Sequence, residues 1–148
     1  MTTRIEGDAY IDSRMGFRVA VPEGMGQPRD ITPSEIRSIA SLVLVEGPKQ
    51  TNLLVLALFL GSDHIDENEL IRIMWKSVGL RWMGVSSLDG MQASEGEFQR
   101  IEMRVYTRER RGRINKIEIV RRAQTIYALV SRAPAKGRKL DSSCVELL

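Results

Sequence analysis

The chain has 148 residues, of which 43% are apolar and 28% are charged. This composition is typical of a globular protein and excludes a disordered polyelectrolyte and a collagen-like fibre. The single cysteine, Cys144, excludes a disulfide scaffold, and the longest apolar run, Leu53–Leu60, is too short to span a bilayer. We predict one domain over residues 10–148, preceded by a flexible N-terminal segment at 1–9.

The beginning of the chain shows no secretory signal. Residues 1–10 read MTTRIEGDAY and lack the apolar core of a signal peptide. The chain is therefore expected to be cytoplasmic or a domain cut from a longer exported protein. A lone cysteine does not distinguish between these compartments.

Charge is distributed unevenly along the chain. Residues 100–139 hold 13 Lys and Arg against 3 Asp and Glu, whereas the rest holds 9 and 16. Such asymmetry suggests an acidic partner surface, a phosphate-bearing ligand, or charge complementarity within the fold itself. The pattern alone leaves these three readings open.

The first half of the chain predicts mainly strands. Apolar residues alternate in 16–22, which indicates a strand that stops at Pro22. The capping-box spacing of 32–35 predicts a helical turn, and Ser38–Glu46 predicts a second strand. Every residue of Leu53–Leu60 is apolar, so this segment is expected to be a strand covered on both faces, with a buried helix as the alternative.

A helix is predicted directly after that strand. Asp66 is suited to cap its N-terminus, and Glu69 suits the positive end of the helix dipole. Gly79 or Gly84 is expected to end the helix. The apolar stripe of this helix comprises Leu70, Ile71, Met74, Trp75 and Val78.

The second half of the chain predicts strands at 96–107, 114–121 and 125–131, with a charged turn at 108–113. A terminal helix is expected over Leu140–Leu148. Together the elements describe an α+β protein with a mostly antiparallel sheet of about six strands.

The order of these elements resembles the PsbP-like domains. The likeness rests on the opening strand Gly16-Phe17-Arg18-Val19-Ala20-Val21-Pro22-Glu23-Gly24 and on the Tyr-containing apolar run Ile126-Tyr127-Ala128-Leu129, with the helix and the basic hairpin between them. The family includes the photosystem subunit PsbP, the Ran-acting nuclear import factor and many bacterial exported domains. It usually has an aromatic residue where this chain has Met25.

That resemblance implies an α/β/α sandwich and a non-catalytic binding or accessory role, for example in a bacterial envelope protein. The implied partner is a protein, and no cofactor is implied. The family pattern has no catalytic residue to transfer to this chain, and a fold is not evidence for a particular activity.

The residues that carry catalytic chemistry are sparse. His64 is the only histidine, and Cys144 is expected to pack in the core, so a Cys-His pair is not favoured. The segment Asp63–Glu67 contains metal-ligand types, but it is better explained as a polar turn that caps the helix. Glu95 and Glu97 share a strand face without an apolar pocket that would suit acid catalysis. We predict no catalytic, cofactor or metal site.

The basic hairpin at 100–122 is the strongest candidate for a binding surface. Clustered guanidinium groups bind carboxylates and phosphates, so an acidic protein or membrane surface is a candidate partner. Nucleic acid or another polyanion is the alternative, disfavoured because few aromatic residues are available for stacking. The predicted binding residues are Arg100, Arg104, Arg108, Arg110, Arg111, Arg113, Lys116 and Arg122.

Overall fold

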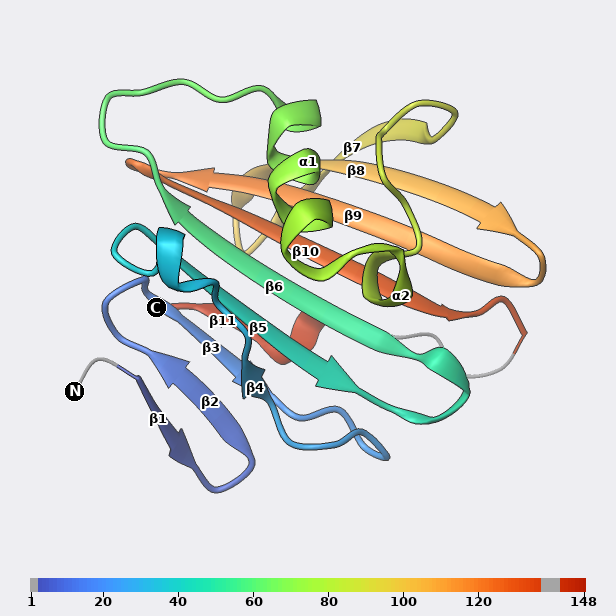
Figure 1. Ribbon diagram of the computed structural model, residues 1–148, viewed down its shortest axis with the longest axis horizontal. Helices are drawn as coiled ribbons and strands as arrows, with labels where there is room; N and C mark the ends of the chain where they lie inside the picture. Colours follow the sequence, from blue (N-terminus) through green and yellow to red (C-terminus); the bar gives the residue numbers. More distant parts are fainter. Residues whose placement is uncertain (1–2, 137–141) are drawn as a thin grey trace.

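The computed structural model describes residues 3–136 and 142–148. In this part of the chain, eleven strands form a seven-stranded and a four-stranded sheet, and all pairings are antiparallel (Figure 1). The larger sheet contains, in spatial order, β4 (Arg29–Asp30), β5 (Ala40–Glu46), β6 (Asn52–Phe59), β10 (Thr125–Pro134), β9 (Arg113–Arg122), β8 (Ile101–Arg110) and β7 (Gln92–Phe98). The smaller sheet contains β1 (Thr3–Glu6), β2 (Ala9–Asp12), β3 (Phe17–Ala20) and β11 (Val145–Leu147).

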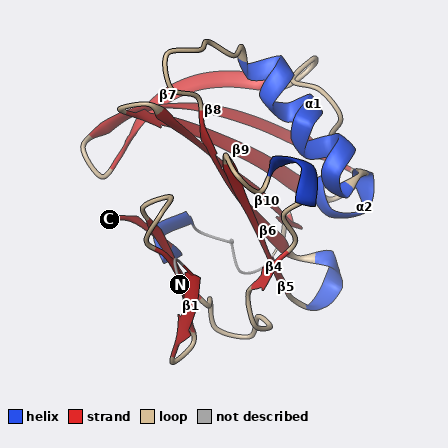
Figure 2. Cartoon of the chain, turned by 60° about the vertical axis from the view of Figure 1, so that its left-hand side comes forward, coloured by secondary structure: helices blue, strands red, loops and turns tan. Residues whose placement is uncertain are grey.

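The predicted helix is confirmed as α1 (Glu67–Val78). The Asp66 carboxylate caps it by accepting a hydrogen bond from the Glu69 backbone N–H at 2.8 Å. Gly79 ends the helix with a positive φ of 75°, and α2 (Leu80–Met83) follows immediately. Both helices lie on one face of the larger sheet (Figure 2).

The two faces of the larger sheet have different covers. On one face, Leu54, Leu56 and other buried residues pack against Leu70 and Met74 of α1. On the other face, the alternate residues of β6, such as Val55, pack against the smaller sheet. The prediction that the apolar run is a strand covered on both faces is therefore confirmed up to Leu58.

The predicted α/β/α sandwich of about six strands differs from this arrangement. In the part of the chain that the structure describes, α1 and α2 cover one face of the larger sheet, and a four-stranded sheet covers the other. An apolar run shows that a strand is buried on both faces, but it does not distinguish a helix from a second sheet as the covering layer. The structure has more strands than predicted mainly because both ends of the chain form strands, as do the residues around 30 and 95.

The end of the chain was predicted as a helix over Leu140–Leu148, and the described part of it is mainly a strand. Leu140 and Asp141 lie outside the described residues. After a single 3-10 turn at Ser142–Cys144, β11 pairs with β3. Val145 and Leu147 point into the core between the sheets while Glu146 is exposed, which is the alternation of a strand.

The described part of the N-terminal segment, from Thr3 onward, includes a strand. Within 1–9, Thr3–Glu6 form β1 and pair with β2, and Ala9 is buried. Gly7 enables the tight turn between these strands because its φ is 61°, a conformation that costs glycine little. The helical turn predicted from the spacing of 32–35 is present as a 3-10 turn at Ser34–Ile36, with Pro33 at its N-cap position and no side-chain cap.

Candidate binding surface

The predicted basic residues lie on a long hairpin whose two faces are separated by the sheet. Directly paired residues of antiparallel strands share a face, and Tyr106 of β8 is paired with Ile117 in the core beneath the helices. Arg104, Arg108, Arg110 and Arg113 therefore project from the helix-covered face of the sheet. Lys116 and Arg122, at alternate positions of β9, project from the opposite face.

The same residues are also separated along the strands. Arg100 lies in the turn between β7 and β8, beside the end of β9 where Arg122 lies. Arg111 lies in the turn at the other end of β8, between Arg110 and Arg113. A ten-residue strand spans about 30 Å, so the two groups are far apart. The structure therefore does not bring the eight predicted residues together as one patch.

Several of these side chains are engaged within the fold. Arg113 Nη1 donates to the Lys49 carbonyl at 2.7 Å, and Arg104 Nη1 lies 3.4 Å from Glu67 Oε1. Arg122 Nη2 donates to the Gly16 carbonyl at 3.2 Å, which ties β9 to the smaller sheet. Part of the positive charge of this segment therefore holds other loops against the sheet.

The end of α2 shows this role most clearly. Arg108 Nη2 donates to the Gly84 carbonyl at 2.9 Å, and Asn115 Nδ2 donates to the Met83 carbonyl at 3.0 Å. Carbonyl groups at a helix C-terminus have no partner within the helix, so side-chain donors stabilise them. A Cβ atom at Gly84 would lie 2.5 Å from Asn115 Nδ2, which explains the glycine. We count Arg108 as a structural residue.

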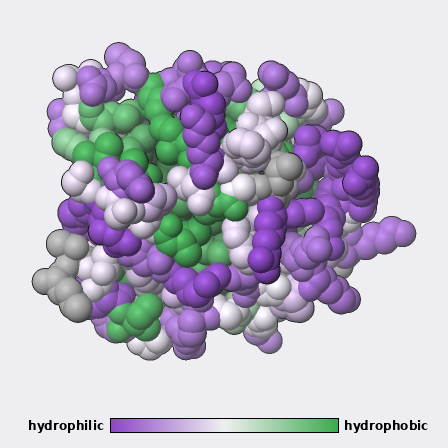
Figure 3. Space-filling view, in the orientation of Figure 1, coloured by the Kyte–Doolittle hydropathy of each residue, from purple (hydrophilic) through white to green (hydrophobic). Residues whose placement is uncertain are grey.

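The tip of the hairpin is different. Arg110 and Arg111 are exposed, and neither forms a hydrogen bond or ion pair with another described residue. In the space-filling view, hydrophilic side chains gather at the right-hand end, where Figure 1 draws the turn between β8 and β9 (Figure 3). Arg100, in the turn at the other end of β8, is exposed and without a described partner in the same way, but it stands alone, whereas Arg110 and Arg111 are adjacent.

Charge near the hairpin tip also affects Arg132, a partly buried arginine that the sequence analysis did not select. Burial lowers the pKa of Arg132, and the neighbouring guanidinium of Arg113 lowers it further. On the same face of the sheet, burial raises the pKa of Tyr106, and the Glu67 carboxylate raises it further. The register between β9 and β10 brings Arg132 and Arg113 together, so no local sequence signal identifies this pair.

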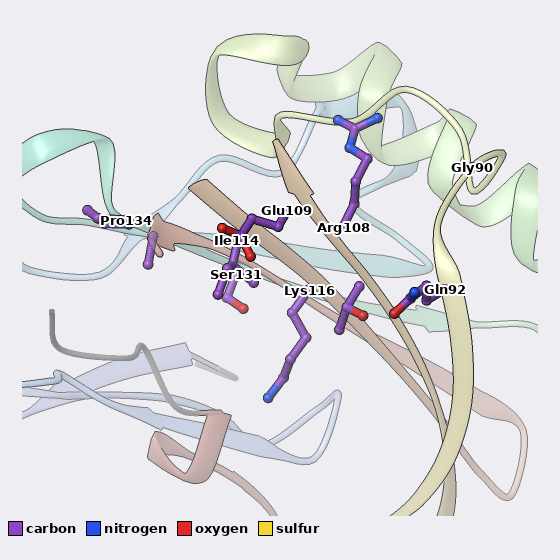
Figure 4. Close-up of a pocket in the computed structure, with 10 residues that line it drawn as sticks. Gly90, Gln92, Arg108, Glu109, Ile114, Lys116, Ser131 and Pro134 are labelled. Atoms are coloured by element: carbon purple, nitrogen blue, oxygen red, sulfur yellow. The ribbon is translucent and has the colours of Figure 1, made fainter. Parts of the chain in front are cut away.

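A cavity of about 650 Å³ lies near the tip. Most of its lining side chains project from the face opposite the helices, and they include Gln92, Thr107, Lys116 and Ser131. Figure 4 shows Lys116 pointing away from the helices, whereas Arg108 points toward them. The sequence analysis selected Lys116 for its charge, but it did not identify the three polar neighbours, which lie on three other strands.

The residues considered for catalysis are not brought together into a site. Cys144 packs against the apolar cluster between the two sheets, whereas His64 lines a separate cavity of about 190 Å³ in the loop before α1. Glu95 and Glu97 are exposed on β7. Among residues 3–136 and 142–148, no group of three His, Cys, Asp or Glu side chains is arranged to hold a metal ion.

Of the helices described, none has both the length and the apolar character that a membrane span requires.

The fold is similar to that of a solved structure. The chain aligns with the solution structure of cyanobacterial PsbP from Synechocystis with a TM-score of 0.53. The alignment covers 88% of this chain and 85% of the other, at 11% sequence identity. The chain has a PsbP-like fold. No family model matches it, and no curated protein sequence matches it.

Met25, at the position where the resemblance predicts an aromatic residue, packs against the apolar cluster between the two sheets. A Cβ atom at Gly47 would overlap the Met25 sulfur, so Gly47 leaves space for this side chain. Met25 thus contributes an aliphatic side chain to the core between the sheets.

Proposed function

We propose that this chain is a non-catalytic accessory domain that binds an acidic surface of a partner protein with the tip of the β8–β9 hairpin. The PsbP-like fold supports an accessory role. The observation that carries the choice of surface is that Arg110 and Arg111 are exposed and without a partner among the described residues, whereas most other predicted arginines are engaged.

The chemistry of the tip fits a carboxylate-rich partner. A guanidinium group donates two parallel hydrogen bonds to one carboxylate, and two adjacent groups provide a fixed pattern of donors. Such contacts lie at the rim of an interface, so they raise the association rate and weaken with added salt. The separation of the basic residues over two faces and two ends does not support the polyanion alternative over 100–122.

The test is quantitative capture of proteins from a lysate of the source organism with the full chain as bait. We expect Arg110→Glu/Arg111→Glu to reduce the captured partner at least tenfold, because charge reversal turns attraction into repulsion. The matched control is Arg72→Glu/Lys76→Glu, which makes the same charge change on the exposed side of α1.

Circular dichroism melting should show that both variants are folded. Equal capture by wild-type and tip variant would overturn the choice of surface. Capture of no protein at all at low salt would overturn the accessory role itself.

A further inference from the structure

A cavity of about 490 Å³, separate from the two described above, lies where α2 approaches the turn between β5 and β6. This connection contains the 3-10 turn Pro48–Gln50, and α2 lies against β6 and β10 (Figure 1). The volume is in the range of small-molecule sites. The side chains that line the cavity include Glu46, Gln50, Asn52, Arg81, Trp82 and Arg132.

The two arginines of this lining have no carboxylate partner among the described residues. Neither Arg81 nor Arg132 takes part in an ion pair there, and the carboxylate of Glu46 is paired with Arg29. Burial lowers the pKa of Arg132, and the guanidinium of Arg113, which also lacks a described ion pair, lowers it further. With the Glu46–Arg29 pair counted as neutral, the lining has two unpaired positive charges and a third beside it.

Two polar groups at this cavity lack the partners that buried polar groups normally have. Asn52 is only 3% exposed, yet its side-chain amide forms no hydrogen bond with another described residue. The Nε atom of Arg132 is buried and likewise has no hydrogen-bond partner in the described part of the chain. The register pairs Asn52 directly with Arg132, so the two side chains are neighbours on one face of the sheet. Buried polar groups are normally satisfied, so this pair calls for a partner from outside the chain.

The arrangement of the donors favours one compact dianion. Arg132 Nη1 lies 3.5 Å from the Arg81 carbonyl oxygen, so the two arginines are adjacent. The Arg81 guanidinium stacks over the Trp82 ring at 4.5 Å from its centroid, which holds it at the cavity. Guanidinium groups present fixed donors to phosphate oxygens, and a phosphate group is nearly a dianion at neutral pH. Two adjacent unpaired cations therefore suit a phosphate better than a singly charged carboxylate.

The rest of the lining indicates what carries the phosphate. Gln50 and Glu46 supply oxygen acceptors, which suit hydroxyl groups on a ligand. The cations gather at one cavity and not along an extended groove, whereas nucleic-acid binding requires contacts that follow the backbone. A single small phosphate ester fits this arrangement better than a strand of nucleic acid.

We propose that this cavity binds the phosphate group of a small hydroxylated phosphomonoester. The phosphate oxygens accept hydrogen bonds from the side chains of Arg81, Arg132 and Asn52. Their negative charge offsets the repulsion between Arg132 and Arg113. The proposal does not depend on the docking of a protein at the hairpin tip.

The test is an amide-resolved NMR titration of the full chain with glycerol 3-phosphate at about pH 7.5, where the phosphate is mostly a dianion. Sodium acetate and sodium succinate at equal ionic strength are the comparison ligands. We expect saturable shifts centred on the Asn52 side-chain amide and the Trp82 indole N–H. Glycerol 3-phosphate should bind at least tenfold more tightly than acetate, because it gains a further charge-assisted hydrogen bond. Succinate carries its two charges on separate groups and should also bind more weakly.

Matched variants assign the shifts to the cavity. Arg81→Gln removes one charged donor from an exposed position and should weaken glycerol 3-phosphate binding about tenfold. Arg72→Gln makes the same change on the exposed side of α1 and should leave the affinity unchanged. Asn52→Asp replaces a donor with a carboxylate that repels the phosphate, so it should weaken binding at least tenfold. The amide spectrum of each variant shows whether it is folded.

Several outcomes would overturn this assignment: no saturable shift with glycerol 3-phosphate, the same affinity in Arg81→Gln as in the wild type, or tighter binding of acetate or succinate. A fourth is tighter binding of a short single-stranded RNA at the same signals, since that would identify the source of the phosphate as nucleic acid. None of these results depends on whether the tip variant loses its protein partner, so the two proposals fail separately.

Discussion

The central and the outer strands of the larger sheet use their side chains in opposite ways. In β6, seven consecutive residues from Asn52 to Leu58 are buried, and β10 is nearly as enclosed. In β7 only Phe98 is buried, and β8 has no fully buried residue. The centre is thus committed to packing between two layers, and the outer hairpins leave polar and charged groups available for contacts. The proposed protein-binding residues Arg110 and Arg111 lie in this outer part of the sheet.

The largest expected loss of stability comes from a substitution in the central strand β6. Leu56→Ala removes a fully buried side chain beneath the helices and should lower the free energy of unfolding by about 2–5 kcal/mol. Met103→Ala, in outer strand β8, should cost less than half as much because its side chain is only partly buried. Urea unfolding of both variants tests this difference, and equal losses would contradict it.

The next effect concerns the contact between the outer strands and α2. Gly84→Ala should cost about 2 kcal/mol or more, because φ is 76° and the new Cβ would press on Asn115 and Arg132. Gly112→Ala at the tip has a similar φ of 73° with no atom within 4 Å, so it should cost only about 1 kcal/mol. Thermal melting provides the measurement; a larger loss for Gly112→Ala would argue against the packing at α2.

A smaller effect separates structural from exposed arginines. Arg108→Met removes the donor to the Gly84 carbonyl and should cost about 1–2 kcal/mol. Arg111→Met should change stability by less than about 0.5 kcal/mol, since its side chain has no described partner. If guanidinium denaturation gave the two variants the same stability, Arg108 would not be structural.

The smallest effect is a dependence of stability on pH, and it arises from Asp30 of β4, the edge strand opposite β7 in the larger sheet. Burial raises the pKa of Asp30, but hydrogen bonds from Thr32 and Arg37 outweigh it and hold the pKa below its usual value. The carboxylate therefore stabilises the fold above about pH 4, and this contribution is lost as the pH falls through the folded-state value. Asp30→Asn should flatten the acid limb of stability against pH.

The control for this prediction is Arg37→Gln, which should flatten the same limb in part because it removes one of the donors. An unchanged slope in Asp30→Asn would mean that the hydrogen bonds do not stabilise the charged form.

The sequence predicted the buried strand and α1 because their signals are local. Eight apolar residues in a row indicate burial on both faces, and Asp66 with Glu69 indicates a helix start. The nature of the second covering layer was missed because it depends on β1, β3 and β11, which come from opposite ends of the chain. Short strands such as β11 give weak periodicity, so Val145–Leu147 was mistaken for part of a helix.

The candidate sites were predicted only in part for a related reason. Arginines that are close in sequence alternate between the two faces of a strand, so the clustering of Arg104, Arg122 and Lys116 in the sequence is not clustering in space. The grouping of Gln92, Thr107, Lys116 and Ser131 around one cavity depends on the register of four strands. Register over such distances is set by tertiary packing and not by any short motif.

Amide hydrogen exchange of the intact chain tests the contrast between centre and outer strands most directly. Amides of β6 and β10 should exchange only on global unfolding, at least about 100-fold more slowly than those of β7 and the Arg111 turn, which should open locally. Protection of β7 equal to that of β6 would contradict the account, because the outer strands would then belong to the same cooperative core.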